Sequence, residues 1–329
     1  KKNGLSQVQY QSFDHAINIF PGKMNLSGDR SAWRPGIDYI VHPSSKGCGS
    51  LSLKTAFLDS STISSKKAFF KWVKKINWEK SALVIPKKVH AFVGDKSIGV
   101  SLSTNSFGAK AIINSTEDKL TWSVRTSVKD WVEVEVVDSI VDGVKAIRLE
   151  IEQEFNSNFS NQNVLGYVQG KSDDSLIVYT AHYDHLGRMG LETCFYGAND
   201  NAGGAAMLCD LARHFAKPEN QPAYSMLFIA FAAEEAGLIG SKYYTEHPVF
   251  PLAKISLLVN LDLVTTGEDG ITIVNGRIFK QLTKKLERIN TDKGYMKAIK
   301  KRGKAANSDH YWFSEGGTKA IFIYLQGEY

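Results

Sequence analysis

The chain has 329 residues, of which 43% are hydrophobic, and it carries a formal net charge of +6. This length exceeds the usual size of one domain, so we expect two domains, each with its own core. No run of about 18 apolar residues is present, which argues against a membrane-spanning helix. The lysines are scattered without arginine-rich or aromatic-interleaved patterning, so we interpret them as solvated helix faces rather than as a nucleic-acid-binding surface.

Residues 1–35 are predicted to form a hairpin-rich N-terminal segment. Its apolar stretches are interrupted by Pro21-Gly22 and Pro35-Gly36, pairs that favour turns. No group of residues in this segment suggests chemistry.

Residues 36–150 are predicted to form a smaller β-rich accessory domain. Phe69, Val73 and Ile76 recur at helical spacing among lysines, which predicts an amphipathic helix over 64–78. Short apolar runs predict strands at 82–85, 98–102, 111–113 and 131–137. Because histidine, cysteine and acidic residues do not cluster here, we expect this region to cover or flank a site that lies elsewhere.

Residues 151–329 are predicted to form the catalytic domain. Its strands alternate with helices, the pattern of an α/β fold with a mixed, largely parallel sheet and helices on both faces. Residues 164–168 and 176–179 are separated by a short polar segment and are predicted to pair as a hairpin. Further strands are predicted at 226–233, 257–263 and 320–325.

Three of these strands end in potential metal ligands. These ligands are His182, Glu234 with Glu235, and Asp262. Since the carboxyl ends of strands in open α/β sheets border the ligand-binding crevice, we expect these side chains to converge.

Asp200 and His310 complete the candidate site. Asp200 precedes a predicted helix, whose N-terminal dipole favours a carboxylate, and His310 lies in a turn before the last strand. The set is too large for one tetrahedral zinc that keeps a water, so two zinc ions are predicted, with Asp200 as the bridge. Asp184 is placed to hydrogen-bond the second ring nitrogen of His182. We interpret His185, His214 and His247 as structural, and His185, which adjoins the site, is the first exception to consider.

The motifs around these residues resemble those of the M28 zinc aminopeptidases. The matching segments are Ala181-His182-Tyr183-Asp184, Gly197-Ala198-Asn199-Asp200-Asn201, Ala233-Glu234-Glu235, Asn260-Leu261-Asp262 and Ser308-Asp309-His310. They occur in the family's order over about residues 150–327. Residues 36–150 are faintly similar to the protease-associated insert of some members, and the chain stops where members usually continue through a Y-H-containing loop.

The resemblance implies a role for each site residue. His182, Asp200 and Asp262 would hold one zinc, while Asp200, Glu235 and His310 would hold the other. Glu234 would be the general base, and the Asp200–Asn201 peptide bond would be cis.

We therefore expect a di-zinc exopeptidase that hydrolyses peptide substrates at a chain end, and we favour an aminopeptidase. A metal-activated water would attack the scissile carbonyl. Alternatives are a glutaminyl cyclase of related fold, a carboxypeptidase or dipeptidase, and a receptor-like module without catalysis. A periplasmic or secreted location, with the signal peptide removed, fits this reading.

Overall fold

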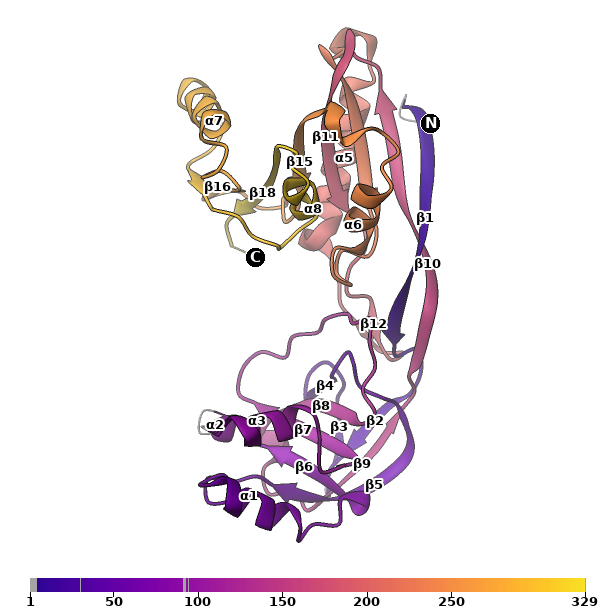
Figure 1. Ribbon diagram of the computed structural model, residues 1–329, viewed down its shortest axis with the longest axis vertical. Coiled ribbons are helices and arrows are strands. Elements are labelled where there is room, and N and C mark those ends of the chain that lie inside the picture. The colour runs from indigo at the N-terminus through magenta and orange to yellow at the C-terminus, as the bar shows by residue number, and fades with distance from the viewer. Residues whose placement is uncertain (1–4, 30, 91–92, 94, 329) are drawn as a thin grey trace. The chain divides into compact units, whose positions relative to one another are not determined.

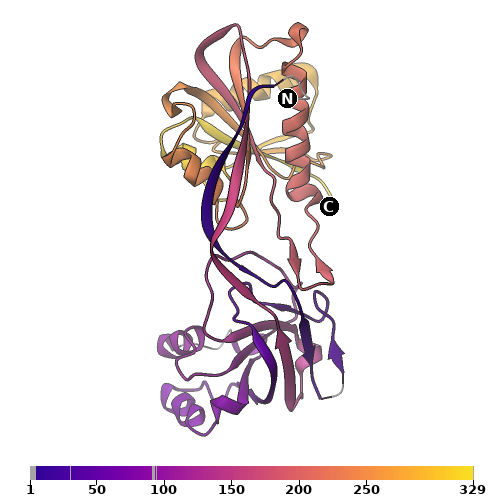
Figure 2. The same ribbon diagram turned by 90° about the vertical axis from the view of Figure 1, so that its right-hand side faces the viewer.

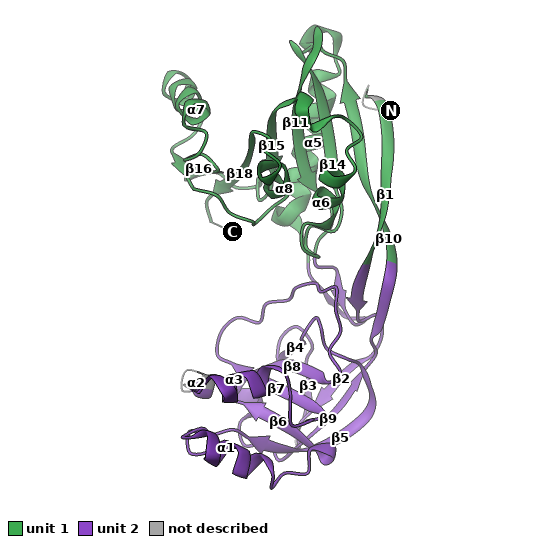
Figure 3. Ribbon diagram, in the orientation of Figure 1, with its two compact units in different colours: residues 1–15, 159–185, 196–329 green, residues 16–158, 186–195 purple. Residues whose placement is uncertain are grey.

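The computed structural model describes residues 5–29, 31–90, 93 and 95–328. The chain divides into two compact units (Figure 3). Unit 1 contains residues 1–15, 159–185 and 196–329, and unit 2 contains residues 16–158 and 186–195. Among the described residues, no helix combines the length and the apolar character that a membrane span needs.

The predicted domains do not coincide with these units; residues 151–158, predicted in the catalytic domain, belong to unit 2. The first residues of the predicted N-terminal segment belong to unit 1, because β1 (Ser6–Ile19) adds to the sheet of that unit beside β10 (Glu154–Val168). Residues 186–195, inside the predicted catalytic domain, belong to unit 2.

Unit 1 is built on an eight-stranded mixed sheet (Figure 1). Its order is β1, β10, β14 (Tyr224–Phe231), β11 (Ser172–His182), β15 (Ile255–Leu261), β18 (Ala320–Gln326), β16 (Gly270–Val274) and β17 (Ile299–Lys301). The central strands β14, β11, β15 and β18 run parallel, and β10 and β16 are antiparallel to their inner neighbours. The predicted α/β class with a largely parallel centre is confirmed.

One predicted pairing is wrong. Strands β10 and β11 do not form a hairpin, because β14 lies between them and pairs with both. Only residues 169–171 separate β10 from β11, and the two strands occupy separate places in the sheet.

Helices pack on both faces of this sheet (Figures 1 and 2). Tyr244 of α6 (Ile239–Glu246) and Phe313 of α8 (His310–Glu315) pack with Val178 on one face. Leu208 of α5 (Gly204–Phe215) and Leu282 of α7 (Lys280–Lys293) belong to the cluster on the other face. Strand β11 is thus buried on both sides, which its continuous apolar run predicts.

Unit 2 contains a second eight-stranded sheet. Its order is β3 (Ala32–Trp33), β2 (Met24–Ser27), β9 (Ala146–Ile151), β5 (Cys48–Phe57), β6 (Ser81–Ile85), β7 (Ala111–Thr116), β8 (Val132–Val137) and β4 (Tyr39–Val41). Helices α1 (Lys66–Val73), α2 (Lys87–His90), α3 (Lys96–Ser103) and α4 (Asp138–Val141) accompany it. Two apolar clusters form its core.

The strand predicted at 98–102 is instead helical and forms most of α3. Asp95 caps this helix by accepting the Ser97 N–H, and Ile98 and Leu102, one turn apart, are both buried. Four-residue spacing of the buried side chains and an aspartate at the N-cap stabilise the helix over a strand.

Candidate metal centre

The parallel centre of the unit 1 sheet brings the candidate ligands to one edge. His182 is the last residue of β11, Asp262 directly follows β15, and Glu234 and Glu235 follow β14. These three strands are parallel neighbours, so their carboxyl ends lie together. The expected convergence at the strand ends is therefore a direct result of the sheet order.

The first cluster consists of His182, Asp200 and Asp262. The Nε2 atom of His182 lies 3.3 Å from a carboxylate oxygen of Asp200 and 3.3 Å from one of Asp262. His182 and Asp262 are buried, and the Nε2 atom and the Asp262 Oδ1 atom have no hydrogen-bond partner. Buried polar atoms without partners are costly, so these two atoms, together with the nearby Asp200 carboxylate, fit a cation.

Electrostatics of this cluster agree with that fit. Burial lowers the pKa of His182, but the carboxylates of Asp200 and Asp262 outweigh it and raise the pKa to about 12. Without a bound cation, a proton on the His182 ring supplies the positive charge that the cation would otherwise bring to the two carboxylates.

The second cluster consists of His185, Asp200 and Glu235. The Nδ1 atom of His185 lies 2.8 Å from Glu235 Oε1. Burial and the nearby Asp200 charge raise the pKa of Glu235 to about 7, and burial lowers the pKa of His185. Asp200 belongs to both clusters, the arrangement expected of a carboxylate that bridges two ions.

His185, and not the predicted ligand His310, belongs to this cluster of the described residues. His310 is fully buried, neither ring nitrogen has a hydrogen-bond partner, and it belongs to neither cluster of the described residues. Its ring lies against Phe322 with centroids 5.5 Å apart, and burial lowers its pKa to about 4. His185 follows His182 in the same loop at the end of β11, and this position was the sequence signal that it could join the site. The sequence analysis interpreted His185 as structural.

The Ser308-Asp309-His310 motif contributes instead through its serine. The Ser308 hydroxyl donates to Asp262 Oδ2 at 2.8 Å and accepts from the Asn260 amide at 2.7 Å. Asn260 in turn accepts the Thr180 hydroxyl at 2.7 Å. This buried chain of hydrogen bonds fixes the orientation of the Asp262 carboxylate.

Asp184 acts differently from the prediction. The nearest Asp184 atom to His182 Nδ1 is the backbone oxygen, at 3.1 Å, whereas the carboxylate is 3.8 Å away. The carboxylate instead accepts the backbone N–H groups of Glu234 and Glu235 at 3.1 and 3.2 Å. Asp184 therefore positions both the histidine ring and the turn that carries the two glutamates.

Glu234 lies in a buried and acidic environment. Burial and the charge of Asp309 raise the pKa of Glu234 to about 9. Asp309 is itself fully buried, and burial raises its pKa. The sequence analysis assigned Asp309 no role beyond its motif, and its effect on Glu234 depends on the fold of α8 against the sheet.

Asp200 is held by an unusual backbone. The Asp200–Asn201 peptide bond is cis, which confirms the prediction. The Asn201 side chain is buried, donates to the Leu261 carbonyl at 3.0 Å and accepts the Gly204 N–H at 3.0 Å. These contacts join the Asp200 turn to the end of β15 and to the start of α5.

The fold and the two clusters together define the class of α/β metallohydrolases. The chain belongs to peptidase family M28, because the model of "Peptidase family M28" matches residues 163–328. The predicted family is therefore confirmed.

Relatives and solved structures agree with this assignment. Aminopeptidase YwaD of Bacillus subtilis is 32% identical over 114 residues, covering 34% of this chain and 23% of that protein. A probable zinc metalloprotease of Pyrenophora teres f. teres is 29% identical over 177 residues, covering 50% of this chain and 36% of that protein. The chain thus spans about a quarter to a third of the length of these curated relatives.

The fold of the whole chain is also shared with a solved structure. BSAP, described as a zinc aminopeptidase from Bacillus subtilis, matches with a TM-score of 0.68 and 20% identity, over 98% of this chain and 75% of that one. The similarity extends through both units and confirms the zinc exopeptidase fold predicted for the catalytic part.

Proposed function

We propose that this chain is a zinc-dependent exopeptidase that removes residues from the amino end of peptides and holds two zinc ions. The observation that carries this proposal is the pair of ligand clusters that share Asp200. Similarity to proteins named aminopeptidase supports the choice of the amino end.

The proposed ligands are the members of the two clusters. His182, Asp200 and Asp262 would hold one ion, and His185, Asp200 and Glu235 the other. His310, the ligand that the family resemblance implies for the second ion, lies outside both clusters. Zinc bound in such a site supplies Lewis acidity, which makes a water more acidic and polarises a carbonyl group.

Glu234 is the proposed general base. Its neighbour Glu235 belongs to the second cluster, while Glu234 belongs to neither and is free to exchange a proton. As the general base, Glu234 would take a proton from the attacking water and give it to the leaving amine. Asp184 keeps Glu234 in place through the hydrogen bond from its backbone N–H.

Metal content and substrate preference together test this function. We expect two equivalents of zinc in the active protein, and hydrolysis of fluorogenic amino-acid amides that a chelator abolishes. Peptides with a blocked amino end should be resistant. A fully active preparation with one zinc that cyclises N-terminal glutamine would support the glutaminyl cyclase instead, and release of carboxyl-terminal residues would indicate a carboxypeptidase.

A further inference from the structure

A hairpin formed by residues 186–195 joins the two segments that carry the ligands. His185 directly precedes this hairpin, and the segment that leads to Asp200 directly follows it. The hairpin belongs to unit 2, although the residues on both sides of it belong to unit 1. The chain between two ligands of one site is therefore folded into the other unit.

The hairpin is closed by its own hydrogen bonds. Strands β12 (Arg188–Met189) and β13 (Thr193–Cys194) pair antiparallel. At the base, the Phe195 N–H donates to the Gly187 carbonyl at 2.9 Å. The two ends of the hairpin are thus held side by side, and an anchor at one end constrains the other.

Met189 anchors the first strand of the hairpin in the core of unit 2. Its side chain is fully buried, and its sulfur accepts the Val41 N–H at 3.2 Å. The Gly190 N–H donates to the Phe20 carbonyl at 2.9 Å. Gly190 has a φ of +70°, and a Cβ atom there would lie 2.3 Å from a side-chain carbon of Met24. This close approach requires glycine.

Trp122 anchors the base of the hairpin. Its indole N–H donates to the Leu186 carbonyl at 3.1 Å, and its ring stacks on Phe195 with centroids 5.4 Å apart and planes at 4°. Leu186 and Phe195 are the first and last residues of the hairpin. A single buried side chain of unit 2 therefore holds both chain ends that continue into the metal ligands.

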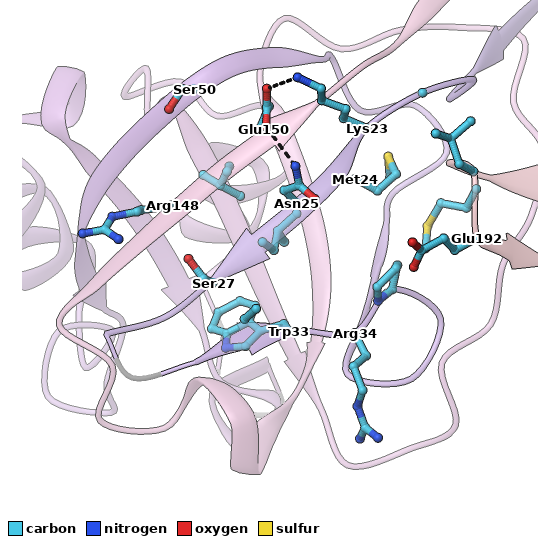
Figure 4. A pocket seen from close by; sticks show the side chains of 17 residues that line it. Lys23, Met24, Asn25, Ser27, Trp33, Arg34, Ser50, Arg148, Glu150 and Glu192 are labelled. Atoms are coloured by element: carbon cyan, nitrogen blue, oxygen red, sulfur yellow. Dashed lines mark hydrogen bonds and ion pairs between the residues drawn. The ribbon is translucent and has the colours of Figure 1, made fainter.

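The turn of the hairpin is less constrained than its base. Leu191 and Glu192 line a pocket of about 540 Å³ whose other walls include Met24 and Trp33 (Figure 4). Leu191 is 65% exposed. Packing at the base and at Met189, rather than at the turn, fixes the hairpin.

We propose that unit 2 positions the metal-ligand loop by holding this hairpin, and that Trp122 is a positioning residue for zinc binding. This inference rests on the proposed function, since it concerns the same site. A loop with fixed ends loses less conformational entropy when its ligands close around an ion. Removing the anchor should therefore weaken zinc binding without changing any ligand.

A matched pair of variants tests this role. Trp78 is also a buried tryptophan of unit 2, and its indole N–H also donates to a backbone carbonyl, that of Val73, at 3.0 Å. It belongs to the other apolar cluster of unit 2, not to the one that contains Trp122 and Met189. Trp122→Leu and Trp78→Leu therefore remove the same chemistry from one unit at two places.

Zinc affinity, measured by competition with a chromogenic chelator, should separate the two variants. We expect Trp122→Leu to weaken zinc binding about tenfold to a hundredfold, the usual effect of losing a group that orients ligands. Trp78→Leu should stay within about twofold of the wild type. Trp122→Phe, which keeps a ring for Phe195 to stack on, should lie in between.

Hydrogen exchange of the metal-free protein gives a second measurement that needs no zinc. Trp122→Leu should speed exchange at the backbone amides of Asn201–Gly204, whereas Trp78→Leu should not. If Trp122→Leu does not fold, Phe195→Leu replaces it in both measurements. Equal zinc affinity and equal exchange in the two tryptophan variants would overturn the inference. A wild-type protein that binds no zinc would refute the proposed function, and the exchange measurement would still decide the positioning role.

Discussion

Replacing Glu234 by glutamine separates general-base catalysis from metal binding. Glutamine keeps the size of the side chain but cannot accept a proton, and general acid–base catalysis contributes about a hundredfold to ten-thousandfold in rate. We expect Glu234→Gln to lower turnover by that factor and to keep both zinc ions, because Glu234 belongs to neither ligand cluster. Glu235→Gln should instead lose zinc, since an amide oxygen lacks the charge that a divalent ion needs.

The same substitution has an opposite effect on the stability of the metal-free protein. The pKa of Glu234 is raised from 4.5 to about 9 in the fold. Below pH 4.5 the carboxyl is protonated in both the folded and the unfolded chain and costs nothing. As the pH rises toward 9, only the unfolded chain loses the proton, so the free energy of unfolding falls by about 1.4 kcal/mol per pH unit. At pH 7 the free energy of unfolding of the metal-free wild type is therefore lower by about 3 kcal/mol than at pH 4.5, and the glutamine variant does not show this decrease.

Urea unfolding of metal-free wild type and Glu234→Gln at pH 4 and pH 7 tests this reasoning. We expect equal midpoints at pH 4 and a higher midpoint for the variant at pH 7. A variant that is less stable than the wild type at pH 7 would show that Glu234 is ionised and paired in the metal-free fold, and would refute the electrostatic argument. A variant with normal turnover would exclude Glu234 as the base.

Three further predictions concern the ligands and their supports. Ser308→Ala removes the hydroxyl that donates to Asp262 and should weaken zinc binding about tenfold in chelator competition, whereas Ser314→Ala in α8, the helix that follows Ser308, should not; equal effects would contradict the orienting role of Ser308. His185→Asn should lose one zinc equivalent by metal analysis while His310→Asn keeps both, and the reverse result would restore the ligand set that the family resemblance implies. Zinc at a hundred times its Kd should add about 2.7 kcal/mol to the unfolding free energy and raise Tm; an unchanged Tm would argue against a specific site.

Most of the site could be predicted because its ligands lie at the ends of parallel strands. An apolar run that stops at His182 or next to Asp262 predicts a buried strand. It also predicts that the last residue lies at the edge of the sheet where the neighbouring parallel strands end. Asp200 was expected near these residues, and it belongs to both candidate clusters. Each of these signals is local in the sequence, and the parallel order of the strands brings the residues together in space.

Other features depend on contacts between distant residues and were missed. The insertion of β14 between β10 and β11 is decided by sheet packing, and a short turn between two strands does not reveal it. The positions of His185 beside Glu235 and of His310 against Phe322 depend on the packing of elements that are distant in the sequence. The apolar run at 98–102 is too short for its period to distinguish a strand from a helix.

The order of strands in unit 1 also sets the order in which the chain can assemble. Neither β10 nor β11 has its shared neighbour until β14, which ends at Phe231, has been synthesised. The interval between synthesis and pairing is longest for strand β1, because it ends at Ile19 and its partner β10 begins only at Glu154. Such long-range pairings are slow to form, because the chain loses the conformational entropy of a long loop before the stabilising contacts between the strands are made. Unit 2 draws nearly all of its residues from one continuous stretch, so it is able to fold first, while the peptidase sheet is still incomplete on the ribosome.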